Sequence, residues 1–282
     1  MKGDLLTPAD LLGQPTEVMA KVRERCFTSY LGDNTALCRV LGQFMMYLDT
    51  KDIGLGAHLM MNGAWEIGLT QFMVRIVKTG MRVADIGANF GYYSHLMSAL
   101  IGPSGFCHSF EPNPHVARLL RQSLSINGFD GFSKVHEIAL DDATGESPKF
   151  WIPDGEAKNA CILDHVNEYF EARGQIITVP TSTFSEMDLG HLDFIKLDVE
   201  GAEYRVLMGM LHYMREYRPQ LVAEINFGRN YDAKALVSEI AGLYGRSPRF
   251  VGDDGYAHEI EIGRMASENV GLDWLVYFSS HV

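Results

Sequence analysis

Cysteine is scarce in this sequence, and long apolar runs are absent from it. The 282 residues include four cysteines, Cys26, Cys38, Cys107 and Cys161, with no CxxC pair among them. We therefore expect neither a zinc site nor a disulfide framework, and we interpret the protein as cytoplasmic with reduced thiols. No apolar run approaches the roughly 18 residues that a membrane span needs. The first ten residues also lack the apolar core of a secretory signal, so we expect no membrane partner.

Basic side chains are also few. The chain has 24 Lys and Arg against 36 Asp and Glu, which gives a formal net charge of −12 at pH 7. Binding to nucleic acid takes most of its affinity from basic side chains placed against phosphates. The acidic surface therefore predicts no nucleic-acid partner, and we interpret the short basic run KVRER as a solvated helix face.

The remaining composition is that of an ordinary globular protein, with 46% hydrophobic and 21% charged residues. In residues 1–78, apolar residues recur every three or four positions, for example in NTALCRVLGQFMMYL and AWEIGLTQFMVRIV. This spacing predicts helices. We therefore expect a helical extension over residues 1–78 that caps the following domain, pairs two copies of the chain into a homo-oligomer, or does both.

From residue 79 onward, short apolar runs alternate with helical stretches. The runs are RVADIG, GFCHSFE, KVHEIAL, DFIKLDVEG, QLVAEIN, RFVG and WLVYF. Strands that are buried on both faces and separated by helices indicate βαβ units and a parallel sheet. Residues 79–282 are thus predicted to form one α/β domain, with its ligand in the crevice at the carboxyl ends of the strands.

The stretch VADIGANFG, residues 83–91, joins the first of these strands to the next helix. Gly87 and Gly91 flank Asn89, and glycine at such a turn lets a ligand approach the backbone. The spacing differs from the dinucleotide pattern GxGxxG, and Asp85 would repel a pyrophosphate but suits a positively charged amino group. The loop therefore favours the methionine end of S-adenosylmethionine (SAM). A tight turn without a ligand is the alternative.

Two further positions fit the same ligand. Glu111 ends the second strand about twenty residues after the loop, the distance at which an acid reaches ribose hydroxyls. Both NAD and SAM contain ribose, so Glu111 does not distinguish them, and a solvated loop glutamate is the alternative. After the third strand, Ala139 and Leu140 are candidates for an apolar wall beside adenine.

The segment FIKLDVEGAE places Lys196 in the middle of a buried strand. A lysine there is unfavourable unless it is paired, and Asp198, Glu200 or Glu203 could be its partner. One interpretation is a structural ion pair. The other is that Asp198 and Glu200 overhang the crevice as catalytic acids, with Lys196 holding their geometry.

The next strand ends in Glu224 and Asn226, at the same edge of the sheet as Asp198. These three oxygen ligands form a candidate magnesium site, and a hydrogen-bonding rim without metal is the alternative. His95, one turn beyond the glycine loop, is a reserve general base, because the pKa of histidine suits proton removal near neutrality. A packed or solvated histidine is the alternative. The segment WIPDGEAKNACILDHVNEYFEARGQ is interpreted as a lid over the substrate.

Three segments in combination resemble the FkbM-type family of SAM-dependent methyltransferases. They are ADIGANFGYYSHLMSALIGPSGFCHSFEPNP, FIKLDVEGAE and QLVAEIN, and the similarity runs from about Tyr47 to the end. The resemblance implies an α/β, Rossmann-like class I methyltransferase fold. Its mostly parallel sheet would have seven strands, the last of which, in LDWLVYFSS, runs antiparallel.

The resemblance also implies O-methylation, mostly of sugar hydroxyls or natural products. By position, the SAM loop corresponds to Asp85, Gly87, Asn89 and Gly91, and the ribose acid to Glu111. The fourth-strand motif corresponds to Lys196, Asp198, Glu200, Gly201 and Glu203.

Two further positions are compared with the family pattern. Glu66, in NGAWEIG, matches a family glutamate that would close over the methionine end of SAM, with a contact to the N-terminal helices as the alternative. The family's usual Thr-Leu-Asp motif ahead of the fourth strand appears here as Thr183-Phe184-Ser185. The aspartate of that motif is therefore missing, together with any role that the family gives it.

The sequence thus predicts a SAM-dependent O-methyltransferase that acts on a hydroxyl of a small molecule, a sugar or a glycosylated or polyketide natural product. Asp198 or Glu200 would orient the acceptor. Three alternatives stay open: an N-methyltransferase of a small molecule, a nicotinamide-dependent oxidoreductase, and a non-catalytic SAM-binding partner protein.

Overall fold

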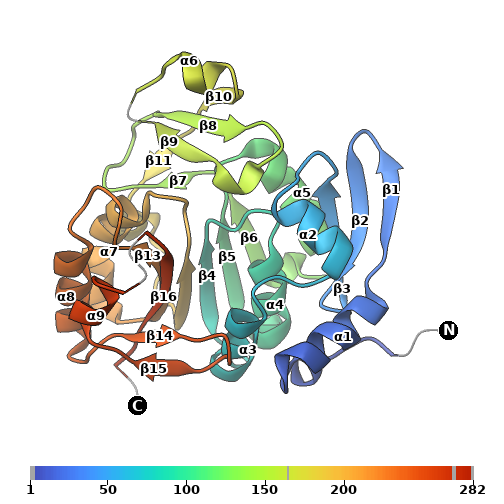
Figure 1. Ribbon diagram of the computed structural model, residues 1–282, viewed down its shortest axis with the longest axis horizontal. Helices are drawn as coiled ribbons and strands as arrows, with labels where there is room; N and C mark the ends of the chain where they lie inside the picture. The colour runs from blue at the N-terminus through green and yellow to red at the C-terminus, as the bar shows by residue number, and fades with distance from the viewer. Residues whose placement is uncertain (1–3, 164, 269–270, 281–282) are drawn as a thin grey trace.

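The computed structural model describes residues 4–163, 165–268 and 271–280. In this part of the chain the largest sheet has eight strands in the order β15-β14-β16-β13-β12-β4-β5-β6 (Figure 1). The strands are β4 (Arg82–Ile86), β5 (Phe106–Phe110), β6 (Ser133–His136), β12 (Phe194–Leu197), β13 (Gln220–Asn226), β14 (Arg249–Val251), β15 (Ala257–Glu259) and β16 (Asp273–Phe278).

The strand directions confirm the predicted sheet. From β6 to β13 all neighbours are parallel, and β16 runs antiparallel to β13. The sheet has one strand more than the seven predicted, because β15 forms an antiparallel pair with β14. This order and the reversed β16 define the predicted Rossmann-like class I methyltransferase fold.

Helices cover both faces of the sheet, which is why its central strands are apolar along their whole length. One face packs against α3 (Ile67–Ile76), α4 (Tyr92–Ile101) and part of α5 (Pro114–Ile126). The other packs against α7 (Glu203–Tyr217) and α8 (Ala233–Tyr244). The short α9 (Ile262–Met265) follows, and 3-10 helices lie at Pro8–Leu11, Gly102–Ser104, Asp130–Phe132, Ala157–Asn159 and Phe184–Met187. No helix in the described ranges combines the length and the apolar character required to cross a membrane.

The N-terminal extension is only partly helical, and this corrects the prediction. It contains α1 (Pro15–Arg25), β1 (Thr28–Gly32), β2 (Thr35–Val40), β3 (Phe44–Asp49), α2 (Leu55–Asn62) and α3. The stretch predicted as a helix, NTALCRVLGQFMMYL, forms the antiparallel hairpin of β2 and β3. Burial alternates along both strands with a period of two. The helix prediction failed because the outer face of the hairpin also carries apolar side chains, which hid the alternation.

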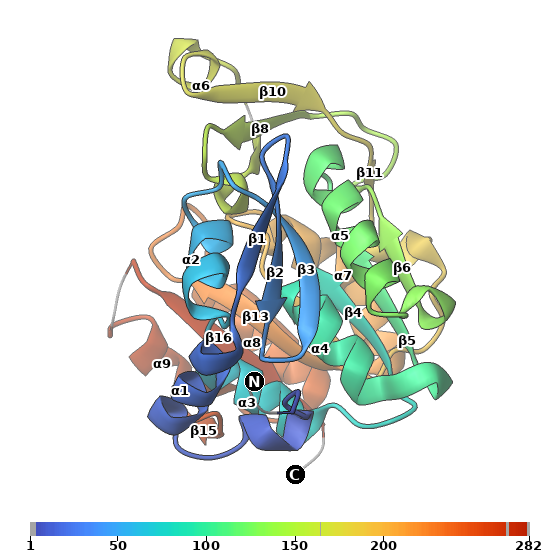
Figure 2. The same cartoon turned by 90° about the vertical axis from the view of Figure 1, so that its right-hand side faces the viewer.

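The helix α5 lies beside β3, at the edge of the hairpin (Figure 2). The side chain of Asn127, just after α5, accepts a hydrogen bond from the Met45 backbone N–H at 3.0 Å. The hydroxyl of Ser123 accepts a hydrogen bond from the Tyr47 backbone N–H at 2.8 Å. The free edge of β3 is therefore covered by side chains of the sheet domain.

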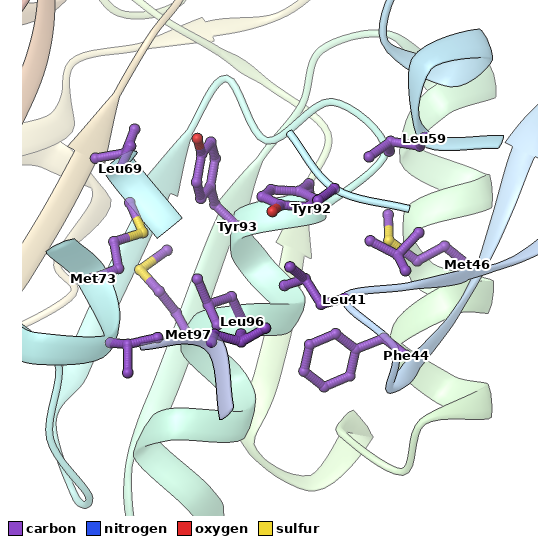
Figure 3. Packing of buried hydrophobic residues seen from close by; sticks show 14 of the residues in the cluster. Leu41, Phe44, Met46, Leu59, Leu69, Met73, Tyr92, Tyr93, Leu96 and Met97 are labelled. Carbon is purple, nitrogen blue, oxygen red and sulfur yellow. The ribbon is translucent and has the colours of Figure 1, made fainter. Parts of the chain in front are cut away.

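The extension and the sheet domain share one apolar core. Leu41, Phe44 and Met46 of the extension pack with Tyr92 and Leu96 of α4 (Figure 3). The Phe44 ring lies 6.0 Å from the His95 ring and 6.1 Å from the Phe129 ring, between centroids. The domain boundary near residue 79 stays a prediction.

Residues 149–163 and 165–178 form a separate small layer, which we call the lid. It consists of β8 (Lys149–Pro153), β9 (Cys161–Leu163), α6 (Glu168–Glu171) and β10 (Gly174–Thr178), with β8 in the middle of its three-stranded sheet. In Figure 1 the lid lies at the top of the molecule. It is joined to the domain through the paired strands β7 (Ala139–Leu140) and β11 (Thr181–Ser182).

Replacement of Phe44 by alanine tests the shared core. Phe44 is 2% exposed, so we expect Phe44→Ala to lower the free energy of unfolding by about 3–5 kcal/mol. Urea denaturation followed by circular dichroism would measure the loss. Met61→Ala is the control, because Met61 is 78% exposed and should change stability by no more than about 0.5 kcal/mol. A Phe44→Ala variant as stable as the parent would contradict the shared core.

Candidate cofactor and acceptor site

A cavity of about 390 Å³ lies where β4, β5 and β12 end and the lid begins. Its volume is within the roughly 300–1,000 Å³ typical of small-molecule sites. The glycine loop forms one wall, and the chain after β12 forms another. Lid residues Phe150, Lys158 and Ile162 contribute to the side opposite the sheet.

Gly87 brings two of these walls together. Its φ is +76°, and a Cβ at this position would lie 1.7 Å from the carbonyl oxygen of Asp198. The neighbouring Ile86 carbonyl accepts a hydrogen bond from the Asp198 backbone N–H at 3.1 Å. Only glycine therefore allows the loop after β4 to contact the chain after β12 this closely. Gly87 and Asn89 both line the cavity.

Gly91 has a packing role, which corrects its predicted place in the cofactor site. It does not line the cavity. A Cβ at Gly91 would lie 2.1 Å from the Leu120 side chain, and its φ is +89°. The glycine lets the start of α4 approach α5, and in this way it shapes the loop.

Asp85 also lies behind the cavity wall, so the predicted direct contact with an ammonium group is wrong for this arrangement. It is fully buried and pairs in register with Lys196 on β12. Its carboxylate accepts a hydrogen bond from the Ser94 hydroxyl at 2.6 Å and lies 3.8 Å from Lys196 Nζ. Alternation along the strand directs both side chains toward α4. Asp85 therefore acts on the site through Lys196.

Lys196 connects the buried Asp85 to the cavity. Its ammonium donates to Asp198 Oδ2 at 3.1 Å and to the Gly87 carbonyl at 3.5 Å. It also lies 5.2 Å from the centre of the Tyr93 ring. Burial alone would lower the pKa of Lys196, but Asp198 and Asp85 raise it above its ordinary value. The predicted pairing of Lys196 with Asp198 is confirmed, and it holds Asp198 at the cavity wall.

Glu111 lines the cavity at the end of β5. Its two carboxylate oxygens accept hydrogen bonds from the backbone N–H groups of Asn89, at 2.9 Å, and Asn113, at 2.8 Å. Burial raises the pKa of Glu111 to about 7, although both hydrogen bonds lower it. Ala139 and Leu140 also line the cavity.

A group of acids surrounds the other end of the cavity. Glu66, Asp198, Glu200, Glu224 and Asp273 all line it. Burial, followed by the charges of Asp198, Asp273 and Glu66, raises the pKa of Glu224 to about 9. Sequence analysis missed Asp273. It is the first residue of the antiparallel β16, which begins at the edge where the parallel strands end, so the reversed direction of this strand was the available signal.

Glu200 and Glu66 are both held by local structure. Glu200 has a φ of +53°, a conformation that non-glycine residues adopt rarely. The carboxylate of Glu203 fixes this turn by accepting the N–H of Gly201 at 2.8 Å. Burial and then Asp198 raise the pKa of Glu200 to about 7. Glu66 accepts a hydrogen bond from the Tyr93 hydroxyl at 2.6 Å, and burial raises its pKa.

His95 is not part of the site, so its prediction as a reserve base is wrong. It is fully buried, with Nδ1 2.6 Å from the Gly91 carbonyl oxygen. Its ring packs between Phe44 and Phe129. The helix turns this residue toward the extension, and burial lowers the pKa of His95.

The predicted metal set is not assembled either. Asn226 does not line the cavity. Its amide group donates to Asp273 Oδ1 at 2.8 Å and accepts the N–H of Gly228 at 2.8 Å. Across residues 4–163, 165–268 and 271–280, no group of three or more His, Cys, Asp or Glu side chains has the spacing to hold a metal ion. Asn226 instead orients Asp273.

The charge of the cavity distinguishes the candidate ligands. Among the described residues that line it, six carry a carboxyl group and two carry an ammonium: Glu66, Glu111, Asp198, Glu200, Glu224 and Asp273, with Lys158 and Lys196. The two phosphates of a dinucleotide would be repelled by this excess of acids. SAM carries two positive groups, a sulfonium and an ammonium, and a neutral adenosine. The residues present therefore fit SAM.

Fold and site together define a Rossmann-like class I methyltransferase. The chain belongs to the methyltransferase FkbM domain family, whose model matches residues 85–249, more than half of the sequence. The resemblance inferred from the motifs is thus confirmed, and SAM is the cofactor expected of this family.

Individual relatives are distant or match over short segments. A protein-L-isoaspartate O-methyltransferase of Methanocella arvoryzae is 34% identical over 74 residues, which cover 26% of this chain and 37% of the relative. A second, from Methanothrix thermoacetophila, is 35% identical over 48 residues, 17% of this chain and 23% of that protein. This chain therefore aligns with well under half the length of either relative. The solved FkbM methyltransferase of Methylobacillus flagellatus has a TM-score of 0.45 at 13% identity, over 75% of this chain and 53% of that one.

The pKa of Glu224 predicts how stability depends on pH. The folded protein keeps a proton on Glu224 that the unfolded chain releases, between about pH 4.5 and about pH 9. Stability from this proton is therefore present at low pH and is lost as pH rises through that window. We expect Glu224→Gln to raise the melting temperature at pH 8 by about 2–8 °C, where 1 kcal/mol corresponds to roughly 2–4 °C. Thermal unfolding at several pH values would show the difference in melting temperature between the variant and the parent shrinking toward pH 5.

The exposed Glu259 provides the control for this experiment. Glu259→Gln should leave the melting temperature unchanged across the same pH range. A Glu224→Gln variant that melts below the parent at pH 8 would contradict the raised pKa.

Proposed function

We propose that this protein is a SAM-dependent O-methyltransferase that methylates a hydroxyl of a small molecule, a sugar or a glycosylated or polyketide natural product. The observation that carries the proposal is the group of acids beside the glycine loop. Its negative charge suits the positive groups of SAM, and it contains a carboxyl, Glu200, whose pKa of about 7 suits proton removal.

The cofactor would lie between the glycine loop and β7. Ala139 and Leu140 would contact adenine, and Glu111 would accept hydrogen bonds from the ribose hydroxyls. Gly87 and Asn89 leave the backbone of the loop accessible, and Glu66 would face the ammonium of the methionine moiety. When bound, SAM supplies an electrophilic methyl group attached to a sulfonium.

The acceptor would occupy the acid-rich end. Asp198, fixed by Lys196, would orient the hydroxyl, and Glu200 would take its proton as the oxygen attacks. Glu224, with a pKa of about 9, is protonated at neutral pH and would donate a hydrogen bond to another acceptor oxygen. Positioning of this kind supplies a large part of the rate enhancement in a displacement reaction.

The size and charge of the cavity support a small acceptor. Lid residues Phe150 and Ile162 cover it, which would exclude bulk water and large substrates. The acid excess also disfavours polyanionic acceptors such as nucleic acid.

Two further proposals concern the protein as a whole. We propose a homo-oligomer formed through the extension, supported by the exposed apolar side chains of Tyr30 and Leu31 on the edge strand β1. We also propose a cytoplasmic location, supported by the buried thiols of Cys38 and Cys107, which are not oxidised to disulfides.

Transfer of labelled methyl from SAM to a panel of sugars, glycosides and polyketide alcohols tests the reaction, with the matching amines as a second arm. Label in the alcohols is the expected result. Label confined to the amines would show that the protein is an N-methyltransferase and not an O-methyltransferase. A protein that binds SAM and labels neither class would be a non-catalytic SAM-binding protein, and one that binds NAD but not SAM would refute the proposal.

The pH dependence of turnover tests the role of Glu200. A base acts when deprotonated, so kcat/KM should rise with pH and level off above about pH 7. Glu200→Gln should lower kcat by about 10²–10⁴-fold and remove this rise, while the Kd for SAM changes little. The exposed Glu146 provides a matched control, and Glu146→Gln should behave as the parent. If the rise persists in Glu200→Gln, another residue is the base.

A further inference from the structure

Lys158 is the second cation of the cavity, and its role differs from that of Lys196. Whereas Lys196 is paired with Asp198 and Asp85, Lys158 forms no ion pair or hydrogen bond within the described ranges. Its ammonium lies 5.7 Å from the centre of the Trp65 ring, within the range of a cation–π contact. Lys158 and Trp65 both line the cavity. An ammonium in this position is available to a negatively charged ligand group.

The backbone beside Lys158 is held in place by a buried carboxylate. Asp52, in the turn between β3 and α2, is 3% exposed. Its Oδ2 accepts the N–H of Ala157 at 2.9 Å, and its Oδ1 accepts the N–H of Gly56 at 2.6 Å. The N–H of Ile53 also donates to the carbonyl of Gly155 at 2.7 Å. The extension thus holds the lid through hydrogen bonds to the backbone of Gly155 and Ala157, and Ala157 directly precedes Lys158.

The Lys158 side chain is also confined along its length. It passes close to Gly54, where an added Cβ would lie 3.3 Å from the lysine Cδ. Its charge lowers the pKa of both Glu66 and Glu200, which places the ammonium near these two acids. The cavity therefore contains an acid held by Tyr93, Glu66, and a cation without an ion pair among the described residues, Lys158.

This pairing matches the charges of an α-amino acid. The methionine moiety of SAM has an ammonium and a carboxylate on one carbon, and the carboxylate needs a positive partner in a cavity that is otherwise acidic. We propose that Lys158 binds a carboxylate in this cavity, and that the carboxylate is that of SAM. A carboxylate on the acceptor is a second source of the same chemistry. The inference rests on the proposed function.

Decarboxylated SAM, which lacks only that carboxylate, is the direct probe. The parent protein should bind SAM more tightly than the decarboxylated analogue in isothermal titration calorimetry. Lys158→Met should raise the Kd for SAM by about tenfold, the usual effect of losing one charge-assisted hydrogen bond. The Kd for the decarboxylated analogue should stay unchanged. Lys149→Met is the matched control, since Lys149 is an exposed lysine of the same lid that does not line the cavity.

The remaining outcomes separate the two sources and the two proposals. If Lys158→Met keeps the preference for SAM but raises KM only for acceptors that carry a carboxylate, and not for their amides, the acceptor supplies the carboxylate. Two outcomes would refute the role of Lys158 while the proposed function stands. In the first, Lys158→Met changes neither the preference for SAM over its decarboxylated analogue nor these KM values. In the second, it lowers the affinity for both cofactor forms equally. A parent protein that binds neither form refutes the proposed function itself.

Asp52→Asn examines the positioning of Lys158. The amide keeps the size of the side chain but can accept from only one of the two N–H groups that Asp52 now holds. The variant should lose part of the preference for SAM over its decarboxylated analogue. A general loosening of the fold would lower both affinities together, so an unchanged ratio would refute the positioning role of Asp52.

Discussion

The buried ammonium of Lys196 is the interaction on which the site depends. An isolated charge at this depth would be strongly destabilising, and Asp85, Asp198 and the carbonyl of Gly87 together offset that cost. These partners come from β4, from the glycine loop and from the chain after β12. One ion-pair group therefore fixes the relative position of the two strand ends between which the cavity opens. Removal of Asp85 or Asp198 would leave this buried charge with less compensation.

The same packing of charges prepares the cavity for its ligand. Asp198 lies close enough to raise the pKa of both Glu200 and Glu224, so the site holds carboxyls that repel one another when ionised. Such crowding lowers the stability of the fold at neutral pH, which is a common compromise at functional sites. A positively charged ligand would relieve the repulsion. Stability and cofactor binding are thus connected through the same carboxyl groups.

The extension has two structural roles. Phe44 and its neighbours complete the core on the α4 face of the sheet, and Asp52 holds the lid at Ala157. The covering of the cavity is therefore not independent of the extension, although the two are far apart in sequence. Trp65 and Glu66, between α2 and α3 of the extension, form part of the cavity wall itself.

The sequence by itself determined the sheet, the glycine loop and the acid at Glu111, because buried parallel strands leave uninterrupted apolar runs whose ends mark the crevice. It did not determine the secondary structure of residues 35–49, because apolar side chains on both faces of this hairpin have a spacing that also fits a helix. Nor did it show that His95 faces the extension, because the orientation of a helix depends on what packs against it. Asp273 and Lys158 join the site only through an antiparallel strand and a lid that pack against distant segments. Tertiary structure decided these positions, because side chains remote in sequence share a cavity only after the chain has packed.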